Sequence, residues 1–254
     1  HNRREANHKQ HQDEIERKHG NQRNPEGTAE DFRYKSADAP WRPEWRRFCE
    51  ERIDVETILV RLFTDTAYAR SICDPLKFEQ ELFSVAAHMQ CTDLDESFYD
   101  LFTPDELYAF YAVRNYQMYL EEGPSAEFGH RALSDAVPLL RNFVAEADEA
   151  IATGALSASL RYGHDVNVIP LVALLGVREA SGRVWTAEEA AGVWQIHRVS
   201  PMATNVQFIF FRSPETGDVR VRVLHNERDA ELPIGGGPYY PWETLRDYCK
   251  SLYE

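Results

Sequence analysis

The sequence predicts an α/β fold in which a mostly helical first half precedes an α/β second half. Between positions 55 and 120 the apolar residues recur at helical spacing. Near the C-terminus, residues 206–212 and 219–224 are rich in β-branched and aromatic residues, and a short Ser-Pro-Glu-Thr-Gly-Asp connection between them is typical of a hairpin. Helical patterns flank these strands, at residues 168–176, 186–195 and 241–253. We therefore place a mostly helical cap region at residues 1–130 and an α/β part at residues 131–254.

Composition supports a folded protein and argues against several classes of partner. The chain has 254 residues, of which 43% are hydrophobic, so it is long enough to bury a core. Its 28 Lys and Arg against 42 Asp and Glu give a net charge of -14, which argues against binding to nucleic acid or to an anionic membrane. The longest apolar run, residues 166–177, is too short to cross a bilayer.

The cysteines do not form a recognisable metal or redox motif. The four of them, Cys49, Cys73, Cys91 and Cys249, lack Cys-x-x-Cys spacing. This argues against a structural zinc site and against a thioredoxin-like pair. Free thiols and up to two disulfides both remain compatible with the sequence.

The helical elements follow from periodicity and from end signals. Residues 1–50 are strongly polar, and the first part is expected to be a charged helix that ends in a turn at residues 24–27. Thr103 followed by Pro104 and acidic residues is a helix start, which predicts a helix over residues 108–120. Another helix is expected at residues 132–152, closed by Gly154.

A strand, a tight turn and a helix are predicted around His164 and Asp165. Residues 155–162 alternate like a strand, Gly163 is a turn residue, and an apolar helix follows. In an open α/β sheet such turns bind ligands, because the next helix offers its N–H groups to an anion. An imidazole there could bind a phosphate oxygen, and the adjacent carboxyl could protonate a departing alkoxide. For that role Asp165 needs a raised pKa, from burial or from a neighbouring phosphate.

Two uncertainties accompany this motif. Arg161, on the predicted strand, could line the same phosphate pocket, but strand alternation could equally direct it away. An Asp after a strand is also a common helix cap, so the Gly-His-Asp tripeptide alone is compatible with a purely structural turn in an unrelated α/β domain.

The longer sequence around the motif resembles a known family. Residues 163–176, GHDVNVIPLVALLG, look like the C-terminal signature of the branch 2 histidine phosphatases, which include acid phosphatases, phytases and multiple inositol polyphosphate phosphatases. Further segments resemble the inositol polyphosphate phosphatase subgroup: LFSVAAHMQ (82–90), DLFT (100–103), QIHRVSPMATN (195–205), LHNE (224–227) and WETL (242–245). The resemblance covers about residues 50–254 and implies the C-terminal part of that family's α/β domain with a helical cap.

The resemblance implies a phosphomonoester hydrolase that works through a phosphohistidine. Carried over by position, it makes His164 a phosphate contact and Asp165 the proton donor, with phytate or another inositol polyphosphate as substrate. It implies neither a metal nor an organic cofactor, and by the family's habit it implies a secreted or periplasmic protein.

The nucleophile motif of the family, Arg-His-Gly-x-Arg-x-Pro, has no good counterpart in this chain. The nearest segment, residues 17–25, places Lys18 before His19 and has one residue too many between Gly20 and Arg23. We therefore expect an N-terminal half of the same enzyme, as a separate chain or a missing segment, to supply the nucleophile. The alternative is a catalytically inactive phosphate-binding or interaction domain.

Overall fold

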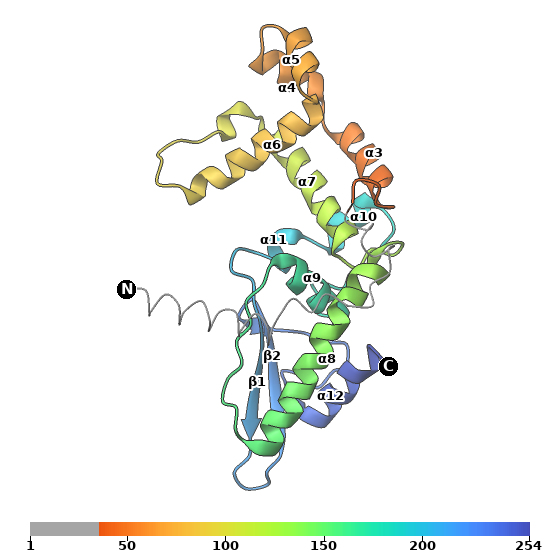
Figure 1. The fold of residues 1–254 in the computed structure, drawn as a ribbon, viewed down its shortest axis with the longest axis vertical. Helices are drawn as coiled ribbons and strands as arrows, with labels where there is room; N and C mark the ends of the chain where they lie inside the picture. The colour runs from red at the N-terminus through yellow and green to blue at the C-terminus, as the bar shows by residue number, and fades with distance from the viewer. Residues whose placement is uncertain (1–35) are drawn as a thin grey trace, which may run out of the picture.

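The computed structural model describes residues 36–254 (Figure 1). The helix and turn predicted within residues 1–27 lie outside the described residues. In the first half the elements are α3 (Arg42–Arg52), α4 (Val55–Leu62), α5 (Thr66–Ile72), α6 (Pro75–His88), η1 (Met89–Cys91), η2 (Tyr99–Leu101), α7 (Pro104–Glu121) and α8 (Gly129–Thr153). In the second half they are α9 (Asp165–Leu174), α10 (Ala187–Val193), α11 (Ile196–Val199), β1 (Val206–Arg212), β2 (Val219–His225), β3 (Arg228–Asp229), β4 (Tyr239–Pro241) and α12 (Trp242–Ser251).

Side-chain caps define the starts of most helices in the first half. Asp54, Asp65 and Asp74 accept hydrogen bonds from the first backbone amides of α4, α5 and α6. Thr103 forms a reciprocal capping box with Glu106 at the start of α7. The helix predicted from this signal is confirmed, and it extends a turn further toward the N-terminus than its apolar pattern indicated.

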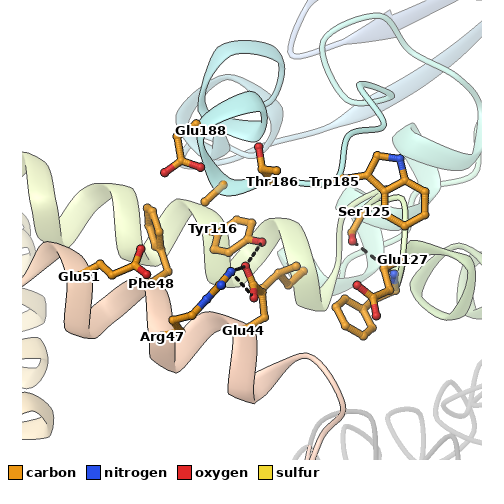
Figure 2. A pocket seen from close by; sticks show the side chains of 13 residues that line it. Glu44, Arg47, Phe48, Glu51, Tyr116, Ser125, Glu127, Trp185, Thr186 and Glu188 are labelled. Carbon is orange, nitrogen blue, oxygen red and sulfur yellow. Dashed lines mark hydrogen bonds and ion pairs between the residues drawn. The ribbon is translucent and has the colours of Figure 1, made fainter.

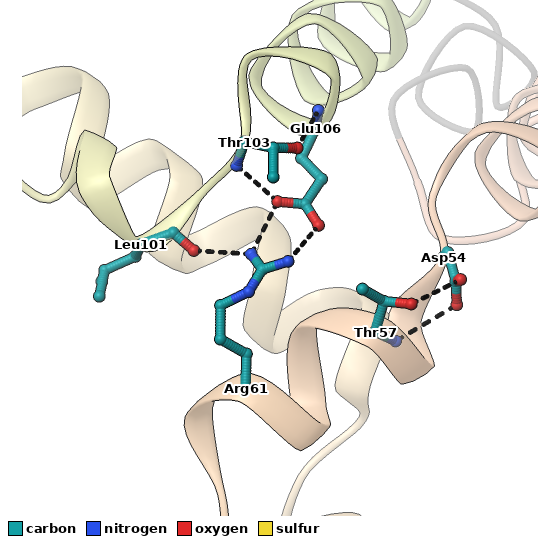
Figure 3. Close-up of polar contacts among 6 residues, drawn as sticks. All are labelled: Asp54, Thr57, Arg61, Leu101, Thr103 and Glu106. Carbon is teal, nitrogen blue, oxygen red and sulfur yellow. Dashed lines mark hydrogen bonds and ion pairs between the residues drawn. The ribbon is translucent and has the colours of Figure 1, made fainter.

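A charged junction ties α4 to the start of α7. The guanidinium of Arg61 donates to both carboxylate oxygens of Glu106, each at 2.8 Å, and to the carbonyl of Leu101 at 3.0 Å (Figure 3). Hydrogen bonds from Arg61 are the main reason why the pKa of Glu106 falls to about 2. The same carboxylate thus caps α7 and holds α4 in place.

The long helix α8 is the support on which the second half is built. It spans the predicted helix at residues 132–152 and ends at Gly154, whose φ of +64° gives the left-handed conformation that favours glycine. α9 packs along α8 through a buried face that includes Ile169 and Val172. No helix in the described part of the chain is both long and apolar enough to cross a membrane.

The sheet is small and antiparallel, and helices cover one of its faces. β1 and β2 form the predicted hairpin, with Val206 opposite His225 and Arg212 opposite Val219, and β3 and β4 pair with β2. Phe208 packs against Phe143 of α8, and Phe210 packs against Trp242 of α12. Together with the helical first half, this sheet confirms the predicted fold class.

The strand predicted at residues 155–162 is wrong. The structure shows an extended segment without strand pairing, which runs from the end of α8 past β1 to the start of α9 (Figure 1). A strand requires a neighbour whose backbone accepts and donates its hydrogen bonds, and no described residue takes that place. The alternating sequence is therefore present without the pairing that it predicts.

The core extends through both halves of the described chain. Its largest fully buried side chains include Trp41 before α3, Tyr116 and Tyr119 on α7, and Trp194 after α10, which are three separate segments. All four cysteines are free thiols, so neither of the two disulfides compatible with the sequence is formed. The domain boundary predicted after residue 130 falls within the first turn of α8 and stays a prediction.

Candidate functional site

The turn before α9 places His164 and Asp165 at a helix N-terminus. His164 is the N-cap residue, with an extended backbone (φ -107°, ψ 166°), and Asp165 is the first helical residue. One carboxylate oxygen of Asp165, Oδ1, accepts a hydrogen bond from the amide of Val166 at 2.9 Å. The imidazole of His164 has no hydrogen-bond partner among residues 36–254, so both of its nitrogens are free to meet a ligand.

Packing of α9 fixes the position of this turn. The helix is held along α8, and the hydroxyl of Tyr248 donates to the carbonyl of Leu175 at its C-terminal end, at 2.9 Å. At its N-terminal end, a Cβ at Gly163 would lie 3.2 Å from Nδ2 of Asn167, the end of an exposed side chain. The packed helix thus holds the turn with His164 and Asp165 in a defined position.

The two predicted catalytic side chains are exposed to solvent. Burial, one of the two effects expected to hold the proton on Asp165, is therefore absent. The α9 N-terminus and the imidazole offer donors to an anion, and among residues 36–254 no Lys or Arg forms an ion pair with Asp165. This arrangement can hold a phosphate oxygen and a proton donor side by side, and a complete phosphate site needs further cations.

Arg161 is engaged by α8 rather than free to bind an anion. Its guanidinium forms an ion pair with Glu146 at 2.6 Å and lies over the ring of Phe143, with Cζ 4.6 Å from the ring centroid. Of the two orientations that strand alternation allowed, the side chain thus takes the one directed at α8. Its predicted phosphate contact stays a prediction, and it would require loss of this ion pair.

A cavity lies away from this turn, between α3, α7 and the segments that lead into α8 and α10. It has a volume of about 240 Å³ and is walled by Phe48, Tyr116 and Trp185 (Figure 2). Its charged lining residues are Glu44, Arg47, Glu51, Glu127 and Glu188, and Arg47 is paired with Glu44 at 2.8 Å. The lining thus carries an excess of negative charge, which repels a phosphate. Sequence reasoning missed the cavity because its walls come from four separate segments.

The remaining expectations concern the nucleophile and a metal ion. His19, the nearest candidate for a nucleophile, lies outside the described residues. Within residues 36–254, no three His, Cys, Asp or Glu side chains gather in a way that could hold a metal ion.

Comparison with solved structures identifies proteins that share this fold. The chain is similar to multiple inositol polyphosphate phosphatase from Bifidobacterium longum in three crystal structures. For the complex with inositol hexasulfate, identity is 23% and the TM-score is 0.59, over 67% of this chain and 38% of that one. For the apo form the values are 25% and 0.57, over 68% and 39%. For the complex with phosphate they are 24% and 0.60, over 70% and 40%.

These similarities confirm the predicted histidine phosphatase-like fold. The chain spans 38–40% of the length of the structures that it matches. Comparison with protein-family models and with curated proteins gives no match.

Proposed function

We propose that this chain carries the proton-donor half of a phosphomonoester hydrolase of the histidine acid phosphatase type. Its substrate class would be phytate or another inositol polyphosphate. The observation that carries the proposal is the exposed, unpartnered His164 beside Asp165 at the N-terminus of α9, in a fold shared with inositol polyphosphate phosphatases.

The chemistry assigns one task to each side chain. The imidazole of His164 hydrogen-bonds a non-bridging phosphate oxygen, and the first-turn amides of α9 favour the same negative charge. A histidine nucleophile attacks phosphorus, and as the bond from phosphorus to the bridging oxygen breaks, Asp165 gives its proton to that oxygen. Water then attacks the phosphohistidine and releases inorganic phosphate.

The nucleophile would come from outside this chain. The sequence contains no Arg-His-Gly tripeptide. An inositol polyphosphate also carries many negative charges, which a chain of net charge -14 repels unless a local basic pocket forms. The proposal therefore includes an N-terminal half of the same enzyme that supplies both the nucleophile and further cations, in a secreted or periplasmic protein.

The direct test is Asp165→Asn in the full enzyme, measured as phosphate release from phytate near pH 5. Loss of a general acid reduces turnover by about 10²- to 10⁴-fold. The loss should be much smaller with p-nitrophenyl phosphate, because its leaving group departs without a proton. A matched control is Glu243→Gln, since Glu243 is an exposed acid in the first turn of α12. Undiminished phytate turnover by the Asp165→Asn enzyme defeats the assignment.

The absence of an Arg-His-Gly tripeptide favours a second candidate, a catalytically inactive phosphate-binding or interaction domain. The two differ in whether a phosphoenzyme forms. Acid-labile phosphate trapped on the full enzyme during turnover supports the hydrolase. Binding of inositol hexasulfate without any phosphate release from phytate supports the inactive domain.

A further inference from the structure

Tyr111, His197 and Arg198 form an exposed cluster that lies outside the turn before α9. The hydroxyl of Tyr111 on α7 lies 2.7 Å from Nδ1 of His197 on α11, and the centroids of the two rings are 5.7 Å apart. Tyr108, one turn earlier on α7, extends this row, with its ring centroid 6.3 Å from that of Tyr111 and its side chain 61% exposed. His197 and Arg198 are also exposed, so the cluster is open to a ligand.

The hydrogen bond between Tyr111 and His197 leaves the other imidazole nitrogen as a donor. The Tyr111 hydroxyl has no other acceptor among residues 36–254, so we assign its proton to the bond with Nδ1. A neutral imidazole that accepts at Nδ1 carries its proton on Nε2, and an imidazolium carries a proton there as well. Nε2 of His197 is therefore an N–H donor in both protonation states, and no described residue accepts from it.

Arg198 adds a positive charge beside this donor. Burial and the neighbouring Tyr108 raise the pKa of Tyr111, whereas the charge of Arg198 acts to lower it, which places the guanidinium near the Tyr111 hydroxyl. No carboxylate among residues 36–254 forms an ion pair with Arg198, although the whole chain has 42 acidic residues against 28 Lys and Arg. An unpaired guanidinium next to an N–H donor suits the oxygens of a phosphate group.

The backbone that carries these two side chains is held from both sides. The buried side chain of Asn115 on α7 accepts a hydrogen bond from the amide of Ile196 at 2.7 Å. Asn226, which follows β2, donates from its side-chain amide to the carbonyl of Arg198 at 3.1 Å. α11 therefore presents His197 and Arg198 from a fixed backbone, and less conformational freedom is lost when a ligand binds there.

The cluster lies at the same end of the β1–β2 hairpin as the turn with His164. α11 is bound to that end by His225, the last residue of β2, whose Nε2 lies 2.8 Å from the carbonyl oxygen of Val199. The end of α8 is bound to the opposite end of the hairpin, where Arg212 donates to the carbonyl of Ile151. From there the chain runs back past β1 to the start of α9, so the turn and α11 come to the same end (Figure 1).

We propose that the cluster of Tyr111, His197 and Arg198 is a subsite for a second phosphate group of a substrate whose first phosphate is bound at the turn before α9. The choice of a polyphosphorylated substrate rests on the proposed function. A chain of net charge -14 must gather positive charge locally to hold such a ligand. Arg198 supplies a cation of this kind at the end of the hairpin where the proposed site needs one.

Labelling of histidines by diethyl pyrocarbonate, read by peptide mass spectrometry, tests the subsite on this chain. The probe is inositol hexasulfate, because it resembles an inositol polyphosphate and a phosphatase does not hydrolyse it. We expect the probe to slow the labelling of His197 and of His164 over the same range of concentration. His88 should be unaffected and is a matched control, since it is an exposed histidine whose Nδ1 is hydrogen-bonded to the carbonyl of Ser84.

Variants of the cluster show whether it binds the probe itself. Arg198→Gln should raise the probe concentration that half-protects His197 by about tenfold, the usual contribution of a charge-assisted hydrogen bond. Tyr111→Phe should raise it by about threefold, because the imidazole loses the bond that orients it. The matched control is Arg46→Gln, since Arg46 is an exposed arginine on α3 without an ion pair in the described chain, and it should change nothing.

The labelling separates this inference from the proposed function. Protection of His164 without protection of His197, or an unchanged half-protecting concentration in Arg198→Gln, overturns the subsite and leaves the proposed function in place. Protection of His197 that persists in His164→Ala, at a higher probe concentration, supports the subsite whatever the result of the turnover assay. Inorganic phosphate should protect His197 only at much higher concentrations than the probe, and equal concentrations would overturn the assignment to a polyphosphorylated ligand.

Discussion

Glu79 is a buried acid whose replacement should change how stability depends on pH. Its side chain lies on α6, fully excluded from solvent, and neither carboxylate oxygen has a hydrogen-bond partner in the described part of the chain. The two arginines whose positive charge favours ionisation of Glu79 are each bound to another carboxylate. Arg61 is held by Glu106, as Figure 3 shows, and Arg70 is paired with Glu56. Glu79 therefore has no cation of its own.

Burial is the main cause that raises the pKa of Glu79 to about 8, from 4.5 in an unfolded chain. The negative charges of Glu106 and Asp54 raise it further, and the positive charges of Arg70 and Arg61 lower it. Between pH 4.5 and about 8 the folded protein keeps this proton while the unfolded chain releases it. The free energy of unfolding therefore falls as pH rises, by up to about 1.4 kcal/mol per pH unit from this group.

Glu79→Gln should remove this dependence, because glutamine has the same shape and does not titrate. Over two pH units inside the window, from about pH 5.5 to about pH 7.5, the wild-type chain should lose up to about 2.7 kcal/mol relative to the variant. Glu79→Leu should be the more stable replacement at the upper pH, since it also removes the unsatisfied buried oxygens.

Urea unfolding followed by circular dichroism at these two pH values measures the effect. The matched control is Glu81→Gln, an exposed acid on the same helix, which should keep the wild-type pH slope. Equal slopes for the wild-type chain and the Glu79→Gln variant would refute the reasoning, because they would show that Glu79 ionises equally in the folded and unfolded states.

Two further predictions concern the Arg61 junction and the thiols. Arg61→Ala should lower stability by about 1–3 kcal/mol above pH 4.5, because it leaves Glu106 without its cation. The difference in urea unfolding should shrink as pH falls toward 2, to the part that comes from the lost bond to Leu101; a difference of unchanged size at low pH contradicts this. Ellman's reagent should modify the exposed Cys91 in the native chain but should reach Cys49 and Cys249 only on unfolding, because burial raises the pKa of the Cys49 and Cys249 thiols to about 12. Mass spectrometry that finds Cys49 or Cys249 modified before unfolding would contradict this prediction.

Much of the fold was predictable because its signals are local. The helix that starts at Thr103 was found from its cap, and the β1 and β2 strands were found from alternation and a turn sequence. The segment at residues 155–162 carries an equally clear alternation, yet it is not a strand. Whether alternation becomes a strand depends on a partner far away in sequence, and no local pattern reports on that partner.

Glu79 shows a signal that sequence reading could have used. It lies three residues after Leu76 and four before Phe83, so it interrupts the apolar stripe of α6 at a position that helical spacing places in the core. The acidic cavity near Trp185 carries no such signal, because its walls meet only in three dimensions. The candidate site was predictable only in part. The turn with His164 and Asp165 was predicted from sequence, whereas the ion pair between Arg161 and Glu146 became visible only in the structure.

The exposure of His164 and Asp165 is itself an argument that this site is completed by another segment. A general acid must hold its proton until the leaving group departs, and in proteins burial or an adjacent negative charge achieves this. The described chain provides no burial at Asp165, and the adjacent charge arrives only with a bound phosphate, which an exposed turn with one imidazole holds weakly against bulk water. The proposed N-terminal half, if it covers this turn, would remove water from it and bring new groups to it at the same time. Docking and proton donation would then be coupled, so that the pH dependence of catalysis would be a property of the complex rather than of this chain.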